Sequence, residues 1–291
     1  MEEPNQSIPS GPYFDDLTVG QLLSPAPPVT IDTGIAAAYQ TISGDPLTTA
    51  LSAPLACAVT GTPGKIVNPA LVMQISIGQS TVATKRAIAN LFYRGVVLNS
   101  TVRMGETLHT TVQIRGLREA TRHNDRPPRG LILLGIETIR VEDNATVVQY
   151  ERCAMLRLRH EEIATGHKDN LGEISHEVEL NDWSESAPIN WDISPLHSLS
   201  TVNWAIGETK TDPMRDTVSS ALEIARLTQN IALIHRDAAT NDFNQRLVYG
   251  GHTIALAQAS LIRLMPGTAT VLGWQSCAPV SYTHLRAHET D

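Results

Sequence analysis

The stretch "RLVYGGHTIALAQASL" (residues 246–261) joins a short apolar run to a pair of glycines and then to residues that favour a helix. The helical pattern continues to Pro266 and Gly267, a combination that ends helices. The first amides of a helix have no partner within it, and glycine lets another group approach the backbone closely. The stretch therefore predicts a helix that starts at Gly250 and Gly251. The alternative for this pair is a plain turn that requires positive φ angles.

The preceding segment, "SALEIARLTQNIALIHRD" (220–237), has apolar residues at the spacing of a helix with one buried face. It ends in His235 and Asp237, two side chains suited to proton transfer. In a loop, the Asp237 carboxylate can orient the imidazole or act as the acid. In a helix, residues two positions apart point in different directions, and Asp237 has no such role. The sequence leaves both alternatives open.

The first half of the chain predicts helices followed by strands. Asp32 is suited to open a helix over 32–43, and a second predicted helix spans 46–61 and ends at Gly61. Four runs rich in β-branched residues then follow, separated by short polar turns: 90–102, 106–120, 129–143 and 145–159. Helices followed by a four-strand meander are typical of an α+β unit.

Two faint internal matches indicate a duplication. Gly44-Asp45 corresponds to Gln229-Asn230 at an offset of 185 residues, and Phe92-Tyr93 lies near Gly273-Trp274 at an offset of 181. Between the two halves, residues 160–190 are polar, acidic and without period, as in an interdomain linker. We therefore interpret the halves as divergent copies of one unit.

Composition excludes several classes of partner. The chain has 291 residues, a formal net charge of -8 and 42% hydrophobic residues, with no basic stripe that would bind nucleic acid. It has no apolar run of about 18 residues and no signal-peptide pattern at its start, so we expect a cytoplasmic protein and no membrane partner. The three cysteines are widely separated, which indicates neither a disulfide framework nor a metal site.

The last twelve residues, "VSYTHLRAHETD" (280–291), resemble the translation of a DNA-library adapter. We treat them as an artefact, so that His284 and His288 receive no functional weight despite their spacing. On this interpretation the second copy is truncated near Pro279.

Several stretches together resemble the MaoC-type hot-dog dehydratases, and in particular the two-module branch of mesaconyl-CoA hydratase (β-methylmalyl-CoA dehydratase). They are "PYFDDLTVGQ" (12–21), "NLFYRGV" (90–96), "VRMGETL" (102–108), "ARLTQNIALIHRD" (225–237) and the opening stretch. The resemblance implies an α+β double hot-dog fold, in which each of two fused modules wraps an antiparallel sheet around a central helix. It divides the chain into an N-terminal module (12–160), a linker (161–195), a partial C-terminal module (196–279) and the artefact (280–291). The modules would form a pseudo-dimer, and a homo-oligomer of the chain remains open.

The resemblance also implies reversible hydration of a 2-enoyl-CoA thioester, with no metal and no cofactor besides the CoA of the substrate. The family pattern places an Asp five residues before a His, which corresponds here to Asn230 and His235. Asn cannot take up a proton at neutral pH, although its amide can hold a hydroxyl or a water. His235 titrates near neutrality and can carry the proton alone. The first copy keeps the acid, Asp45, without the histidine, and we expect a structural role for Asp45.

The remaining candidates would bind the substrate. The amides of Gly250 and Gly251 suit the thioester oxygen, and Tyr249 and His252 flank them, either lining the pocket or packing in the core. Arg94 and Arg246 can pair with a substrate carboxylate or a CoA phosphate, or lie solvated on the surface.

The favoured function is thus an acyl-CoA hydratase or dehydratase, with mesaconyl-CoA or β-methylmalyl-CoA as a candidate substrate. The alternatives are a non-catalytic acyl-CoA-binding scaffold, which has lost its acid, and a hot-dog thioesterase.

Overall fold

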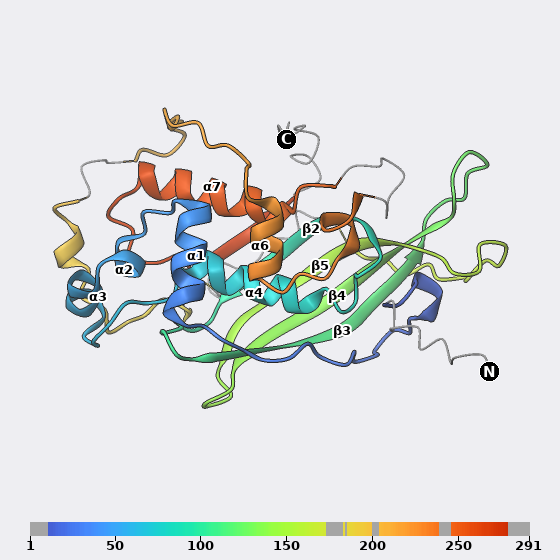
Figure 1. Ribbon diagram of the computed structural model, residues 1–291, viewed down its shortest axis with the longest axis horizontal. Helices are drawn as coiled ribbons and strands as arrows, with labels where there is room; N and C mark the ends of the chain where they lie inside the picture. Colours follow the sequence, from blue (N-terminus) through green and yellow to red (C-terminus); the bar gives the residue numbers. More distant parts are fainter. Residues whose placement is uncertain (1–10, 173–182, 184, 200–203, 239–245, 279–291) are drawn as a thin grey trace, which may run out of the picture.

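One antiparallel sheet and a central helix dominate the computed structural model, which describes residues 11–172, 183, 185–199, 204–238 and 246–278 (Figure 1). The strands follow the order β1-β3-β4-β5-β2-β6 across the sheet. Their bounds are β1 Val29–Thr30, β2 Ala87–Leu98, β3 Thr107–Glu119, β4 Arg129–Arg140, β5 Thr146–Arg157 and β6 Gly273–Cys277. The helices are η1 Phe14–Asp16, α1 Thr33–Ser43, α2 Thr48–Leu51, α3 Ala53–Thr60, α4 Pro69–Ser80, η2 Ser194–Leu196, α6 Ala221–Leu227, η3 Leu233–His235 and α7 Gly250–Leu264.

The predicted helices and meander of the first half are largely confirmed. Strands β2 to β5 lie within a few residues of the four predicted runs, and the Asp32 side chain accepts a hydrogen bond from the Ile35 amide at the start of α1. The second predicted helix is divided into α2 and α3 at Ser52, two residues before Pro54. It ends, as predicted, at Gly61, which has φ 68°. Glycine adopts this left-handed conformation at little cost.

Helix α4 forms the centre of the core. The sequence predicted no helix or strand over its residues. The helix begins at Asn68, whose side chain accepts a hydrogen bond from the Ala70 amide, and Pro69 fits its first turn. All twelve residues of α4 are buried, because β3, β4 and β5 cover one side and α7 packs along another. Each large apolar side chain here, such as Leu71 or Ile75, stabilises the fold by about 2 kcal/mol through burial.

A chain of buried polar side chains ties α4 to the sheet. Ser76 donates to the Tyr150 hydroxyl at 3.1 Å and accepts from Thr138 at 2.6 Å. The Thr138 and Thr110 hydroxyls lie 2.8 Å apart, and Thr110 donates to Gln79 Oε1. Because buried polar groups are costly when unpaired, this chain fixes the rotation of α4 about its own axis.

The predicted helix over 220–237 is wrong beyond Leu227. Helix α6 ends there, and Gln229 follows with φ 59°, a left-handed conformation that is uncommon for a residue other than glycine. Asn230 then closes a tight turn, in which its Oδ1 accepts a hydrogen bond from the Ala232 amide at 2.9 Å. The loop alternative therefore holds for the segment that leads to η3.

The same turn occurs in the first copy. Gly44 has φ 60°, nearly equal to that of Gln229 at the equivalent position. Asp45 Oδ1 accepts a hydrogen bond from the Leu47 amide at 3.0 Å, as Asn230 Oδ1 does in the second copy. Asp and Asn share this acceptor, so the exchange of acid for amide leaves the turn intact.

The pairing of β2 with β6 shows how the copies are related. Tyr93 lies opposite Cys277, and Val96 lies opposite Trp274. The offset of 181 residues makes Tyr93 equivalent to Trp274 and Val96 equivalent to Cys277, so each pair is the mirror of the other. A two-fold axis that exchanges the copies produces this self-complementary pattern, as at the interface of a symmetric dimer. In the described residues, the second copy contributes α6, η3, α7 and β6.

Among the described helices, none has both the length and the apolar composition that crossing a membrane requires. The predicted artefact at 280–291, which contains His284 and His288, lies outside the described residues.

Candidate functional site

His235 lies at the end of η3, where the turn of the second copy leads the chain toward α7. The side chain is half-buried, and Nδ1 lies 3.0 Å from the Leu247 carbonyl oxygen. A carbonyl oxygen only accepts hydrogen bonds, so Nδ1 carries the proton and Nε2 keeps its lone pair. The ring packs against Tyr249, with 5.3 Å between ring centres. The imidazole is therefore held in one tautomer with Nε2 available as a base.

The surroundings of His235 keep its imidazole neutral at physiological pH. Burial lowers its pKa from 6.5 to about 4; the Leu247 hydrogen bond opposes this effect, and the positive charge of Arg152 adds to it. A neutral imidazole can accept a proton from a substrate or a water at pH 7.

This low pKa makes the stability of the fold depend on pH. Between about pH 6.5 and pH 4 the unfolded chain binds a proton on His235 that the folded chain does not, so stability falls as pH is lowered through this window. We expect the free energy of unfolding to lose about 3 kcal/mol from this residue, all of it retained above pH 6.5. Urea denaturation at a series of pH values measures the loss. The difference between the wild-type chain and His235→Gln isolates the contribution, and exposed His123→Gln is the control. Equal pH dependence of wild type and His235→Gln would contradict the assigned environment.

Asn230 has mainly a structural role in this arrangement. It is 1% exposed, and its Oδ1 is used in the turn. Its backbone carbonyl accepts from Arg236 Nε at 2.7 Å, and its amide donates to the Ala225 carbonyl. The turn therefore uses the side-chain oxygen, and the role of the Asn230 amide in holding a substrate hydroxyl or a water stays a prediction.

Asp237 does not orient the imidazole. The carbonyl of Leu247 takes the proton of Nδ1, and His235 has no hydrogen bond to Asp237 in the structure. Asp237 is exposed, and its amide donates to the Leu233 carbonyl at 2.9 Å. The segment is a loop, as the proposed role of the Asp237 carboxylate requires. The Leu247 backbone carbonyl, however, is the group that orients the imidazole.

The two glycines at the start of α7 differ in their surroundings. Neither has a positive φ, so the alternative of a turn that requires one does not explain them. A Cβ on Gly251 would collide with the side chains of Gln74 and Tyr249, while Gln74 Nε2 donates to the Gly251 carbonyl at 2.7 Å. Gly251 therefore permits close packing of α7 on α4. Gly250 is half-buried, which makes it the residue of the pair that a ligand can reach.

Tyr249 and His252 are both buried beside this helix start. Among the described residues, the Tyr249 hydroxyl and His252 Nδ1 have no hydrogen-bond partner. Burial raises the pKa of Tyr249 well above its usual value, and the Asn230 side chain opposes part of that rise. Burial also lowers the pKa of His252. Both side chains are thus neutral, and the ring of Tyr249 packs against the ring of His235.

The two predicted arginines do not join this site as free cations. The Arg94 guanidinium forms an ion pair with Glu151, at 2.6 Å from Nη2. Its charge therefore already has a carboxylate partner, and its pairing with a substrate carboxylate or a CoA phosphate stays a prediction. Arg246 is exposed and precedes α7.

The sequence reasoning missed Arg152 and Tyr93. They lie opposite each other on β5 and β2, and the guanidinium carbon is 5.8 Å from the centre of the Tyr93 ring. Both are buried, and the charge of Arg152 affects the pKa of His235 and of Tyr249. The available signal was the alternation of "YERC" in a predicted strand, which places Arg152 and Glu151 on opposite faces.

Asp45 is buried between the two copies. Its Oδ2 accepts hydrogen bonds from Asn68 at 2.8 Å and from Gln258 of α7 at 2.6 Å. The carboxylate thus links the start of α4 to the second copy. This geometry fits the structural role that we expected for Asp45, since its oxygens are paired with protein donors.

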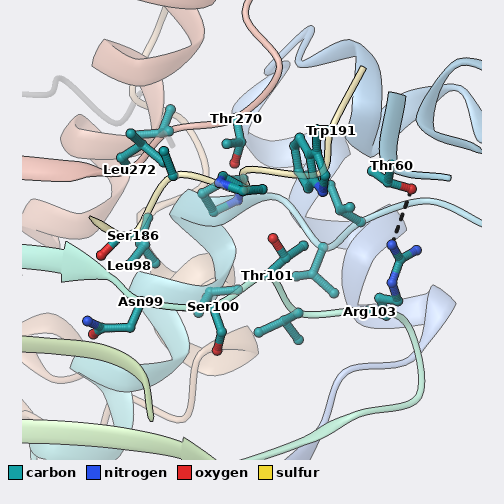
Figure 2. A pocket seen from close by; sticks show the side chains of 18 of the residues that line it. Thr60, Leu98, Asn99, Ser100, Thr101, Arg103, Ser186, Trp191, Thr270 and Leu272 are labelled. Atoms are coloured by element: carbon teal, nitrogen blue, oxygen red, sulfur yellow. Dashed lines mark hydrogen bonds between the residues drawn. The ribbon is translucent and has the colours of Figure 1, made fainter. Parts of the chain in front are cut away.

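A cavity of about 440 Å³ lies at the start of α4, on the first copy's side of the two-fold axis (Figure 2). Its walls include Ile66, Val67 and Pro69, which are equivalent to Leu247, Val248 and Gly250 at the 181-residue offset. The opposite wall is the segment 98–103, whose equivalents in the second copy are 279–284, outside the described residues. Figure 2 shows Arg103 bonded to Thr60 at the edge of this cavity. This cavity therefore occupies the position related by the two-fold axis to the His235 site.

Comparison with characterised proteins shows similarity of the chain to enzymes of one reaction class. No family model matches the chain. Over 269 residues it is 27% identical to the β-methylmalyl-CoA dehydratase of Chloroflexus aurantiacus, an alignment that covers 86% of this chain and 72% of the relative. It is 26% identical over 260 residues to the mesaconyl-CoA hydratase of Cereibacter sphaeroides, covering 86% and 73%.

Solved structures show the fold. A conserved hypothetical protein from Mycobacterium tuberculosis, described as having a double hotdog fold, is 40% identical, with a TM-score of 0.78, and is matched over 92% of this chain and 81% of that one. A putative MaoC domain dehydratase from Chloroflexus aurantiacus is 23% identical, with a TM-score of 0.70 and coverage of 91% and 77%. The α+β double hot-dog prediction is thereby confirmed. The chain is therefore a double hot-dog protein, and it is similar to hydratases and dehydratases of CoA thioesters.

Proposed function

We propose that this chain is an acyl-CoA hydratase or dehydratase in which His235 moves the proton. The observation that carries the proposal is the oriented, neutral imidazole, with Nδ1 bonded to Leu247 and Nε2 available next to the start of α7. The names of the two relatives support a hydro-lyase that acts on a CoA thioester.

Hydration of a 2-enoyl thioester adds a hydroxyl at the β-carbon and a proton at the α-carbon. In the proposed reaction, Nε2 of His235 takes a proton from water while the water oxygen bonds to the β-carbon. The C=C electron pair moves toward the thioester, and negative charge develops on the carbonyl oxygen. The imidazolium then gives its proton to the α-carbon, which restores the thioester. Dehydration follows the same steps in reverse, so that one imidazole serves as both base and acid.

The start of α7 supplies the stabilisation of charge that this reaction requires. The amides of the first turn of a helix are unpaired within it, and the helix dipole places partial positive charge there. The α7 residues Gly250 and Gly251 carry the first two of these amides, and Gly250 is the more accessible. Donors fixed before the reaction stabilise an oxyanion at little reorganisation cost. We assign the Gly250 amide to the thioester oxygen.

For the acyl group, a 2-methyl-branched dicarboxylic thioester such as mesaconyl-CoA is the favoured candidate. Its support is the naming of both relatives for this pair of compounds. A dicarboxylic acyl group requires a cation inside the site, in addition to the base and the oxyanion donor.

The enoyl absorbance of a thioester measures the proposed reaction directly. We expect the chain to remove the absorbance of a 2-enoyl-CoA in water and, in deuterated water, to place one deuterium on the α-carbon. Release of free CoA thiol without hydration would instead indicate the thioesterase alternative. Binding of the thioester without hydration and without α-proton exchange would indicate the scaffold alternative. Either of these two results would overturn the proposed function.

A further inference from the structure

Arg152 is a buried cation that lacks an anionic partner. It lies on β5 and is 4% exposed. Nε donates to Asn90 Oδ1 at 2.5 Å and Nη1 donates to Ser80 Oγ at 3.0 Å, and both acceptors are neutral. Among the residues that the structure describes, no carboxylate lies within ion-pair distance of Arg152, and Nη2 donates no hydrogen bond.

Several other arginines have anionic partners although they are more exposed than Arg152. Arg94 pairs with Glu151, Arg140 with Glu106 and Asp143, and Arg263 with Asp212 and Asp216. Removing a guanidinium from water without a counter-charge is costly. A role in packing alone would be served by an uncharged side chain, so the retained charge points to an anion that binds there.

The location of Arg152 places that anion in the His235 site. The guanidinium faces the Tyr93 ring and bonds to Ser80, and the neighbouring Thr81 accepts a hydrogen bond from the Ile231 amide in the loop that leads to His235. The charge of Arg152 also lowers the pKa of both His235 and Tyr249. The other titratable groups around it are Tyr93, Tyr150, Tyr249 and Cys153, whose pKa values burial raises, so they stay neutral. Within the described part of the chain, no group near Arg152 therefore supplies negative charge at neutral pH.

We propose that Arg152 is a specificity-determining residue that binds a carboxylate on the acyl part of the substrate. The proposal rests on the proposed function, because it places that acyl group next to the imidazole. Nη2 and the remaining N–H of Nη1 lie on one edge of the guanidinium, and a carboxylate can accept from both at once. The phosphates of CoA are an inferior match, because this position is buried beside the base rather than at the protein surface.

The test compares two thioesters that differ only at the distal carbon. Mesaconyl-CoA carries a carboxylate where 2-methylcrotonyl-CoA carries a methyl group. We expect the wild-type chain to have the higher kcat/KM for mesaconyl-CoA. In Arg152→Gln the ratio of the two kcat/KM values should fall by about 10²-fold, as is typical when one member of a buried charge pair is removed. Arg152→Lys keeps the charge but cannot donate two parallel hydrogen bonds to one carboxylate. The ratio of the two kcat/KM values in this variant should therefore be intermediate. Arg140→Gln, which removes an arginine that already has carboxylate partners, is the matched control.

A binding measurement separates this inference from the proposed function. Methylsuccinyl-CoA and 2-methylbutyryl-CoA are the saturated counterparts, which cannot be hydrated. The wild-type chain should bind methylsuccinyl-CoA more tightly, and Arg152→Gln should lose that preference. If wild type hydrates neither enoyl thioester and keeps the binding preference, the proposed function fails and the carboxylate site stands. If wild type hydrates both equally and shows no preference in binding, the carboxylate site is wrong and the hydratase stands.

Folding of the variants is checked by circular dichroism and urea denaturation. If Arg152→Gln does not fold, the ratio of the two kcat/KM values in Arg152→Lys tests the proposal instead. A wild-type ratio in a folded Arg152→Lys, or an equal loss with both thioesters in either variant, would show that Arg152 only supports the packing of α4 on the sheet.

Discussion

Substitution of His235 by glutamine should lower kcat for thioester hydration by roughly 10²- to 10⁴-fold and change KM little. The imidazole is the group that accepts and returns the proton, whereas the CoA part of the substrate binds elsewhere. Glutamine is suited to this test because its amide can still donate to the Leu247 carbonyl that now pairs with Nδ1. The variant therefore removes the base and retains the hydrogen bond that fixes the loop.

The enoyl absorbance assay gives kcat and KM, and incorporation of deuterium at the α-carbon gives an independent measure of proton transfer. Both should fall together in His235→Gln. Exposed His123 lies in the turn between β3 and β4, and His123→Gln should retain wild-type rates. Unchanged turnover by a folded His235→Gln would remove the imidazole from the mechanism, and the start of α7 alone would not explain catalysis.

The strands of the first module could be predicted because they are rich in β-branched residues and some of them alternate between a buried and a more exposed face. In β3, for example, Leu108, Val112 and Ile114 are buried while Thr111 and Arg115 are exposed. Helix α4 offers no such contrast, because its whole circumference is buried and it contains Ser76, Gly78 and other residues that are poor helix formers. Only the surrounding sheet and α7 make it a helix.

The end of α6 illustrates a second limit. The apolar spacing continues through Ile231 and Ile234, which predicts one helix up to Asp237. The chain instead turns at Gln229, in a conformation that glycine adopts at the equivalent Gly44. The turn is stabilised from outside the segment, since the Ile231 amide donates to Thr81 Oγ1 and the Leu233 amide donates to the Lys85 carbonyl. The periodic spacing of apolar residues cannot predict contacts between residues this far apart in the sequence.

Some residues of the site could be predicted from the sequence and others could not. His235 and the start of α7 follow from local sequence, but the choice between Arg94 and Arg152 does not. Both are arginines in predicted strands, and only the register of β2 with β5 places Arg94 opposite Glu151 and Arg152 opposite Tyr93. The partners of Arg152 lie 62 and 72 residues away in the sequence, on β2 and at the end of α4.

Substitution of Gly78 tests the contact between α4 of the first copy and the turn of the second copy that leads to His235. Gly78 lies in α4 where the turn of the second copy crosses the helix, and a Cβ at this position would collide with the backbone carbonyl of Thr228. It would also approach the Asn230 amide nitrogen at 3.2 Å. A backbone cannot move aside as the end of a side chain can, so either α4 or the turn that leads to His235 must shift.

We therefore expect Gly78→Ala to destabilise the fold by about 3 kcal/mol and to lower kcat by at least 10-fold in the fraction that remains folded. In a helix without this contact, the same change would stabilise by up to about 1 kcal/mol, so the sign of the effect is informative. Gly34→Ala is the matched control, since Gly34 is an exposed residue of α1 whose nearest neighbour is the Asp32 carboxylate at 3.2 Å. Urea denaturation and the hydration assay measure both variants. If Gly78→Ala were as stable and as active as Gly34→Ala, the second copy's turn would not rest on α4, and the position assigned to His235 would be wrong.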